Sequence, residues 1–289
     1  MSSDNLLEKV KELREITGVG FKDCKNAIDE TKGDIEKSIE LLRKKGIAKA
    51  NKRMARVAAE GLVCVYEKNN KYSMIEINSE TDFVAKNNEF INFSEQVSKL
   101  ALEKSGNMND ILISKMGNKK NVKENLVDLI SKIGEKITIR RSTFIDNNES
   151  VNFSYVHSSI KKNVGKIGVL LSLKTKKSKG EISDFGKHLA MQIAAASPLA
   201  INQEGIDKKI LEKEKEIIVE ELKSSGKDSK IIAKIAVAKL NKFVSDNTLL
   251  NQEWIIEPKK KVKDILKNIA GKDTIEVKEF KRFKVGEGL

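Results

Sequence analysis

Residues 4–45 place apolar side chains at the spacing of α-helices, with two interruptions by turn-forming residues. The segment 17–20, Thr-Gly-Val-Gly, has the chemistry of a turn and ends the first helix. Gly33 ends the second helix, and Asp34 is placed to cap the third. The pattern therefore predicts a compact module of three helices. The apolar faces of these helices hold Leu6, Val10, Leu13, Phe21, Cys24, Ala27, Ile28, Ile35, Ile39 and Leu42.

The apolar period changes to two after this module, which is typical of β-strands. Residues 61–66 and 72–78 flank a Lys-Asn-Asn-Lys loop and predict a β-hairpin, and a helix follows from near Asn88. Residues 151–157 and 166–173 predict a second hairpin, again followed by a helix. The repeated order predicts two related α+β halves. The apolar stripes of the two helices hold Phe90, Phe93, Val97, Leu100 and Ala101, and then Phe185, Leu189, Ile193 and Ala196.

Helical spacing returns in residues 201–249 and is interrupted by a Ser-Ser-Gly turn at 224–226. Two helices joined by a tight turn form an antiparallel helical hairpin. The charged flanks of this segment predict a projecting arm with one apolar seam, which would bind a partner or a second copy of the chain. Residues 274–285 then predict a final strand.

The formal net charge of +13 raises nucleic acid as a partner, but the composition weakens that interpretation. The 55 Lys and Arg residues are interspersed with 42 Asp and Glu residues, and aromatic residues that stack on bases make up only 5%. Residues 43–56 contain basic residues and no acidic one, and we interpret them as a linker or a solvated helix. A basic RNA-binding protein remains the alternative function, and a salt-dependent gel shift would test it.

No apolar run reaches the length of about 18 residues that a membrane span requires. The N-terminus also lacks the basic-then-apolar layout of a signal peptide. We therefore expect a cytoplasmic protein without membrane contacts or direct nucleic-acid contacts. Cys24 and Cys64 match neither a disulfide framework nor a metal site, so we expect buried, reduced thiols.

Motifs that would indicate catalysis are missing from the sequence. There is no G-x-x-x-x-G-K-[ST] phosphate-binding loop, and Gly18-x-Gly20 lacks the third glycine of a dinucleotide fingerprint. His157 and His188 are the two histidines, and neither lies in a metal-binding motif. We expect no catalytic residue, no metal and no cofactor. A hydrolase with an unrecognised site is the second alternative function.

The segment Thr81-Asp82-Phe83-Val84 follows a strand that ends at Asn78 and precedes the helix predicted from near Asn88. One interpretation is structural: Thr81 or Asp82 caps a helix, and Phe83 packs into the core. The other interpretation is functional: an aromatic and an acidic side chain are presented together to a partner. The residues alone leave both interpretations open.

Several motifs resemble the bacterial elongation factor Ts family. Residues 10–28 and 32–46 resemble the N-terminal module of that family, and residues 79–87, SETDFVAKN, resemble its central signature. Further matches follow in the expected order at 166–173, 187–198 and 281–288. The resemblance covers essentially the whole chain. It implies a non-enzymatic guanine-nucleotide exchange factor that binds elongation factor Tu in its GDP-bound and nucleotide-free forms.

The resemblance also implies a fold, which agrees with the helices and strands predicted from the spacing of apolar residues along the chain. It is an α+β fold with an N-terminal three-helix module similar to ubiquitin-associated domains, two related core subdomains and a helical-hairpin insertion. The insertion would form a coiled coil and a possible homodimer. We expect the module at 1–55, the first core subdomain at 56–150, the second at 151–200 and 250–289, and the insertion at 201–249.

The resemblance assigns roles to particular residues. Within Thr81–Val84, Asp82 and Phe83 would enter the nucleotide-binding domain of elongation factor Tu and disturb its magnesium site. The family often has a long apolar residue where Lys22 stands. Some members continue beyond Val-Gly-Glu-Gly with another helical module, and we expect its contribution to be absent or replaced in this chain. Further partner contacts are implied for Arg14, Phe21 and Lys22, and for His157, Lys187 and His188.

Overall fold

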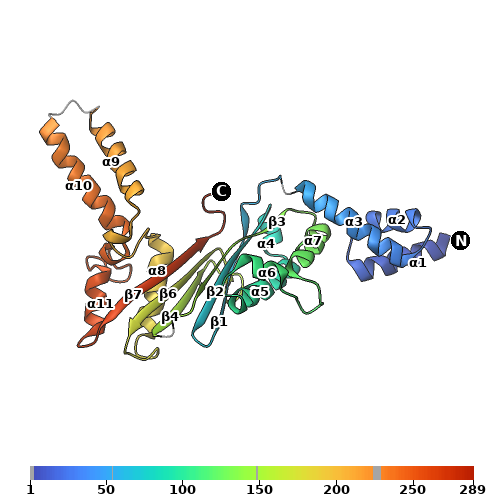
Figure 1. Cartoon of the computed structure of the whole chain (residues 1–289), viewed down its shortest axis with the longest axis horizontal. Helices are drawn as coiled ribbons and strands as arrows, with labels where there is room; N and C mark the ends of the chain where they lie inside the picture. Colours follow the sequence, from blue (N-terminus) through green and yellow to red (C-terminus); the bar gives the residue numbers. More distant parts are fainter. Residues whose placement is uncertain (1–2, 54, 148, 224–228) are drawn as a thin grey trace.

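The computed structural model describes residues 3–53, 55–147, 149–223 and 229–289 (Figure 1). It combines helices with antiparallel sheets, which confirms the predicted α+β class. Three helices at the N-terminus lead into two sheets, and a pair of helices projects from the opposite end (Figure 1). Among the described residues, no helix has both the length and the apolar character needed to cross a membrane.

The N-terminal module consists of α1 (Ser3–Thr17), α2 (Phe21–Glu30) and α3 (Ile35–Arg53). Gly18 and Gly33 have φ angles of +65° and +84°, the left-handed conformation that ends the first two helices. Asp34 Oδ1 accepts a hydrogen bond of 3.0 Å from the Lys37 backbone N–H, which confirms the predicted cap. The helices enclose a core of Val10, Leu13, Cys24, Ala27, Ile28 and Leu42.

Phe21 does not join this core as the sequence predicts, because its side chain is 42% exposed. It is the first residue of α2, where a side chain points back beyond the helix N-terminus and away from the packed face. The third helix is also longer than predicted. It continues to Arg53, so the basic run 43–56 is helical over most of its length and is not an extended linker.

The first half of the core forms a hairpin and a later third strand. Its elements are β1 (Glu60–Lys68), β2 (Lys71–Ser79), α4 (Asp82–Ala85), α5 (Asn88–Glu103), α6 (Met108–Ile113), α7 (Val122–Ile133) and β3 (Ile137–Ile145). Strands β1 and β2 pair antiparallel as predicted, and α5 begins at the predicted residue. Asn69 and Asn70 have φ angles of +52° and +61°. Two consecutive positive values are typical of the tight turn that joins such strands.

The second half contains the second predicted hairpin and the predicted last strand. Its elements are β4 (Ser150–His157), β5 (Val164–Gly165), β6 (Ile167–Thr175), α8 (Ser183–Ala196), η1 (Gln203–Gly205), η2 (Leu249–Asn251), α11 (Val262–Ala270) and β7 (Ile275–Lys284). Strands β4, β6 and β7 form one antiparallel sheet. The loop between β4 and β6 carries β5, which pairs with β1 of the other half.

The two halves share one strand topology, which confirms the predicted relation between them. In each half the second strand is central, and the third strand follows a helical segment. Each central strand also shifts register once against the third strand, between Glu76 and Ile77 in β2 and between Ser172 and Leu173 in β6. The likeness therefore extends to the position of a β-bulge.

The two sheets pack face to face, and helices cover their outer faces (Figure 1). Leu62 and Cys64 of β1 lie in a cluster with residues of α5 and α7. Val63 and Val65 lie in a different cluster, with Leu170 of β6. This alternation follows from the two-residue period of a strand. Helices α8 and α11 cover the other face of the second sheet.

The arm consists of α9 (Lys208–Lys223) and α10 (Ser229–Asn247), as the helical spacing predicts. A parallel bridge between Ala200 and Thr248 closes its base. The predicted turn at 224–226 lies outside the described residues. The seam between the helices buries Ile218, Leu222 and Ala236. Other apolar residues lie off the seam and are exposed, namely Ile210, Ile217, Ile231 and Val237.

The four domain ranges predicted from the sequence stay a proposal. The third helix ends at Arg53, shortly before the proposed boundary at 55/56. The short strand β5 belongs to the range 151–200 but extends the sheet of the first half. The two halves therefore share a sheet edge as well as a packed interface.

Candidate protein-binding site

The segment Thr81–Val84 lies between β2 and α5 and contributes to the single helical turn α4. Thr81 Oγ1 accepts a long hydrogen bond of 3.5 Å from the Val84 backbone N–H, which confirms the interpretation of Thr81 as a cap. Asn87 then caps α5 by accepting hydrogen bonds from two backbone N–H groups of its first turn. The segment therefore has a helix cap at each end, a weak one at Thr81 and a stronger one at Asn87.

Phe83 points away from the core, and its side chain is 79% exposed. The interpretation of Phe83 as a core aromatic is therefore wrong. A single helical turn presents only one side to the sheet, and the buried residues Val84 and Ala85 occupy that side. A large apolar side chain that remains in water offers hydrophobic free energy to a partner that covers it.

Asp82 lies beside Phe83 and is ion-paired within the chain. Its Oδ2 lies 2.8 Å from Lys86 Nζ, one helical turn later, and its side chain is 47% exposed. The hydrogen bond from Lys86 holds the pKa of Asp82 below its usual value, and the positive charge of Lys166 acts in the same direction. The site thus presents a carboxylate next to an exposed aromatic ring.

Two further carboxylates join this turn to the turn before β3. Glu135 accepts hydrogen bonds from the Thr81 backbone N–H at 3.0 Å and from the Thr81 hydroxyl at 2.7 Å. Glu80 accepts one from the Lys136 backbone N–H at 2.6 Å and pairs with Arg56 at 3.2 Å. Sequence analysis did not identify Glu80 or Glu135, because only the pairing of β2 with β3 brings them together.

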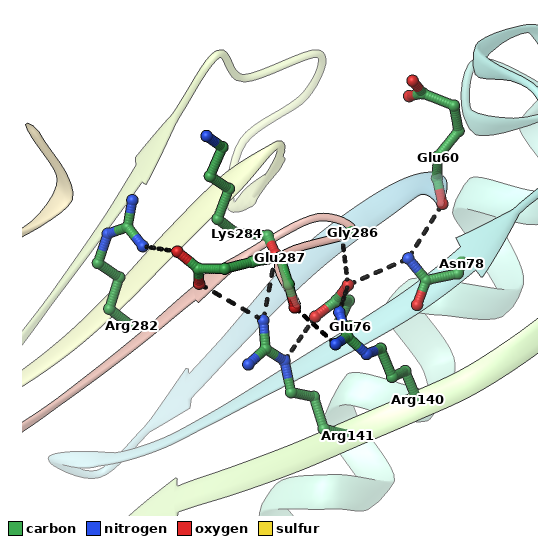
Figure 2. A network of polar contacts seen from close by, with 9 residues as sticks. All are labelled: Glu60, Glu76, Asn78, Arg140, Arg141, Arg282, Lys284, Gly286 and Glu287. Atoms are coloured by element: carbon green, nitrogen blue, oxygen red, sulfur yellow. Dashed lines mark hydrogen bonds and ion pairs between the residues drawn. The ribbon is translucent and has the colours of Figure 1, made fainter. Parts of the chain in front are cut away.

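A buried carboxylate lies further back along β2 (Figure 2). Glu76 is completely buried, and it accepts hydrogen bonds from Arg140 at 3.0 Å, Arg141 at 2.5 Å and the Gly286 N–H at 2.8 Å. Asn78 donates another at 3.0 Å. Consecutive residues of a regular strand point to opposite faces, so the bulge at this position allows both arginines to reach one carboxylate.

This network connects the two halves of the core (Figure 2). Burial by itself raises the pKa of Glu76, but the hydrogen bonds from Gly286, Asn78 and the two arginines outweigh it and hold the pKa below its usual value. The same arginines donate to the carbonyl groups of Glu287 at 2.6 Å and Lys284 at 3.1 Å. The end of β7 is therefore attached to the strand that leads to the candidate site.

The remaining predicted contact residues lie on separate elements. Arg14, Phe21 and Lys22 are exposed on α1 and α2, at one end of the long axis (Figure 1). The His157 side chain is exposed at the end of β4, and its Nδ1 lies 3.1 Å from the Tyr155 hydroxyl. On α8, Lys187 is exposed and His188 is half-buried. The structure does not gather these residues into one pocket, so a common ligand would have to be as large as a protein.

The two cysteines are free and buried, as the sequence predicts. Burial raises the pKa of both thiols, which disfavours the reactive thiolate. In the part of the chain that the structure describes, no group of three or more His, Cys, Asp or Glu side chains is arranged to hold a metal ion.

An exposed aromatic ring beside a carboxylate makes this turn a candidate surface for binding another protein. The family model for elongation factor Ts matches residues 80–287, a range that contains this turn. Proteins named elongation factor Ts from Methylorubrum populi and Bartonella quintana are 42% and 40% identical to the chain. A third, from Magnetococcus marinus, is 39% identical. Each alignment covers 97% of this chain and 92% of the relative.

The chain therefore belongs to the elongation factor Ts family, a family of translation elongation factors. The alignments with these relatives also cover most of the N-terminal module, which lies before the range of the family match.

Proposed function

We propose that the chain binds elongation factor Tu and promotes the release of GDP and its exchange for GTP, as a cytoplasmic factor without covalent chemistry. The observation that carries this proposal is Phe83, which is 79% exposed beside the ion-paired Asp82. Because Val84 and Ala85 anchor the turn in the core, Phe83 and Asp82 can be presented without unfolding the sheet.

The energetics of exchange require only differential binding. GTP-binding proteins hold their nucleotide partly through Mg²⁺ that bridges phosphate oxygens. A factor that binds the nucleotide-free form more tightly than the GDP-bound form must weaken GDP binding by the same ratio. The free energy for release therefore comes from protein–protein contacts, and the factor needs no active site of its own.

Asp82 and Phe83 have different roles in the proposed release of GDP. Phe83 is a rigid apolar wedge, and it gains hydrophobic free energy when a partner covers it. Asp82 brings a negative charge toward the magnesium site, where it competes for metal-binding groups and repels phosphates. Thr81 contributes the cap that holds both residues, and Val84 anchors the turn.

Contacts elsewhere on the chain complete the proposed interface. Arg14, Phe21 and Lys22 would contact the same partner domain from the N-terminal module, and their exposure supports this role. His157, Lys187 and His188 would contact the partner from the second half. The spread of these residues from the N-terminal module to β4 and α8 of the second half supports a partner that is large enough to span this distance (Figure 1).

The release of fluorescent GDP from elongation factor Tu tests the proposal. The double variant Asp82→Ala/Phe83→Ala should slow factor-stimulated release by about tenfold or more, because it removes the apolar contact of Phe83 and the charge of Asp82. A tenfold change corresponds to a loss of about 1.4 kcal/mol in transition-state stabilisation. The variant should remain folded by circular dichroism. Ile113→Ala is the matched control, since Ile113 is 72% exposed on α6 and is no part of the site. Wild-type release by a folded double variant would overturn the proposal.

The arm supports a second proposed contact, the homodimer. Ile210, Ile217, Ile231 and Val237 are exposed on its two helices, so a second arm could bury them. Light scattering of the purified chain, with and without elongation factor Tu, would separate a dimer from a second contact with the partner.

The RNA-binding alternative rests on the net charge of the chain and on the basic run 43–56, and the contacts within this run argue against it. In the run 43–56, the basic side chains that the structure describes all interact within the chain. Arg43 pairs with Glu124, and Arg53 donates to the Ile130 carbonyl, both at 2.8 Å. The other pairs are Lys44–Glu40, Lys45–Glu30 and Arg56–Glu80. A salt-dependent RNA gel shift at physiological salt would be the observation in favour of that alternative.

A further inference from the structure

The sheet of the first half ends next to the candidate site. The last pair of residues in the β2–β3 ladder is Ser79 opposite Ile137. If the ladder continued, Glu80 would lie opposite Lys136, and Thr81 opposite Glu135. The chain turns into α4 at this point, so the backbone groups of the two turns are no longer paired by the ladder itself.

Carboxylates replace the missing carbonyl partners on both sides. The Glu80 side chain accepts from the Lys136 N–H at 2.6 Å, and the Glu135 side chain accepts from the Thr81 N–H at 3.0 Å. The arrangement is reciprocal, because each turn contributes one carboxylate and one backbone N–H. Hydrogen bonds from N–H groups to carboxylates are stronger than those to neutral carbonyls.

Glu135 has an additional contact that reaches the helix cap. It accepts the proton of the Thr81 hydroxyl at 2.7 Å, so the oxygen of that hydroxyl is oriented to accept from the Val84 N–H. This second bond is long, 3.5 Å, and by itself is a weak constraint. Glu135 therefore strengthens a weak cap on a turn that is otherwise held by the buried side chains of Val84 and Ala85.

We propose that Glu135 is a positioning residue, which acts through Thr81 to hold Asp82 and Phe83 in the orientation that enters the partner. This inference rests on the function proposed above. Glu135 itself lies on the neighbouring turn, and its carboxylate accepts from the Thr81 N–H and the Thr81 hydroxyl, so the proposed effect on Asp82 and Phe83 runs through these hydrogen bonds.

The first measurement uses the free chain. Hydrogen exchange at the backbone amides of residues 81–85 should be faster in Glu135→Ala than in the wild type, while exchange in β1 and β2 stays the same. Glu135→Gln should retain protection, because its carbonyl can accept from the Thr81 N–H and its amide can donate to the rotated Thr81 hydroxyl. Unchanged exchange at 81–85 in Glu135→Ala would overturn the inference without any reference to the partner.

The second measurement uses GDP release from elongation factor Tu at saturating factor. Glu135→Ala should lower the maximal release rate by about three- to tenfold, while the half-saturating concentration changes by less than about twofold. The reason is that the other contacts still bind the partner, and only the entry of the pair becomes less probable. Glu135→Gln should restore the rate to within about twofold of the wild type.

A double-mutant cycle separates positioning from general damage. In an Asp82→Ala/Phe83→Ala background, Glu135→Ala should cause no further loss of rate, because both groups that it positions are gone. An equal loss in both backgrounds would show an independent role for Glu135 and contradict the inference. If Asp82→Ala/Phe83→Ala leaves release unchanged while exchange at 81–85 responds to Glu135→Ala, the positioning of this turn by Glu135 stands and the proposed function fails.

Discussion

Phe83 and Phe90 show how position within a short segment decides the role of an aromatic residue. Phe90 lies on the inward stripe of α5 and is completely buried in the core of the first half, whereas Phe83 is 79% exposed on α4. The two residues share one chemistry and differ only in the face of the helix that they occupy. At this scale a candidate site residue is recognised by apolar surface area that remains exposed to water. A buried aromatic residue no longer has such area, because folding has already removed it from water.

This contrast predicts different effects on stability. Phe83→Ala should change the free energy of unfolding by no more than about 0.5 kcal/mol, because the ring touches little of the protein. Phe90→Ala should lower it by about 3–5 kcal/mol, because it leaves a cavity in the core. Urea denaturation followed by circular dichroism measures both values. A large destabilisation by Phe83→Ala would show that the ring packs against the protein in solution.

The outward direction of Phe83 could not be predicted from the sequence. The buried face of a helix is predicted from apolar residues that recur over successive turns. Because α4 contains only one turn, its sequence does not show which side chains face the core. A cap at Thr81 or Asp82 could be predicted from local chemistry, and the structure places it at Thr81. The contact of Glu135 with Thr81 joins residues that are far apart along the chain, and nothing in either local sequence indicates it.

At the scale of elements, the buried charge network joins apolar packing in attaching the end of β7 to the first sheet (Figure 2). Glu76 lies on the face of β2 that looks toward the second half, where Tyr72 and Met74 pack in the same cluster as Phe283. An ionised carboxylate in such a place is tolerated only because hydrogen bonds and two arginines surround it.

The network predicts a pH-dependent contribution to stability. The pKa of Glu76 is lower in the folded chain than in the unfolded chain, so its stabilising effect is present above the unfolded value of about 4.3 and is lost as pH falls through the folded value. Glu76→Gln should therefore cost about 2–3 kcal/mol at pH 7, because it leaves the arginines without a counter-charge. The cost should shrink in the acid range below about pH 4.

Chemical denaturation at several pH values measures this contribution. Glu276→Gln serves as the matched control, since Glu276 is exposed on β7, and its substitution should have an effect within about 0.5 kcal/mol at each pH. A cost for Glu76→Gln that stays constant from pH 7 to the acid range would contradict the role of the ionised carboxylate.

The hairpins, the long helices and the arm could be predicted from the sequence, since each depends on local period and turn chemistry. The Asn69-Asn70 turn is an example, because both residues tolerate the positive φ that the hairpin needs. The pairing of β5 with β1 could not be predicted, because a strand of two residues has no detectable period. The bulge that brings two arginines to Glu76 depends on the register between distant strands.

At the scale of the whole molecule, the proposed contact residues are spread over a long and layered body. The three-helix module lies at one end, the arm at the other, and the packed sheets lie between them (Figure 1). The network at Glu76 and the β5 pairing connect the two halves. A connected body of this kind can bind one partner at several places and use that binding to position Phe83, as the proposed function requires.

The most direct measurement of the central claim is the ratio of two affinities. The chain should bind nucleotide-free elongation factor Tu about 100-fold more tightly than the GDP-bound form, a ratio within the common range of coupling between two ligands. Asp82→Ala/Phe83→Ala should reduce that ratio by about tenfold or more, while Ile113→Ala leaves it unchanged. If the folded double variant keeps the wild-type ratio, Asp82 and Phe83 are not the groups that couple binding to nucleotide release.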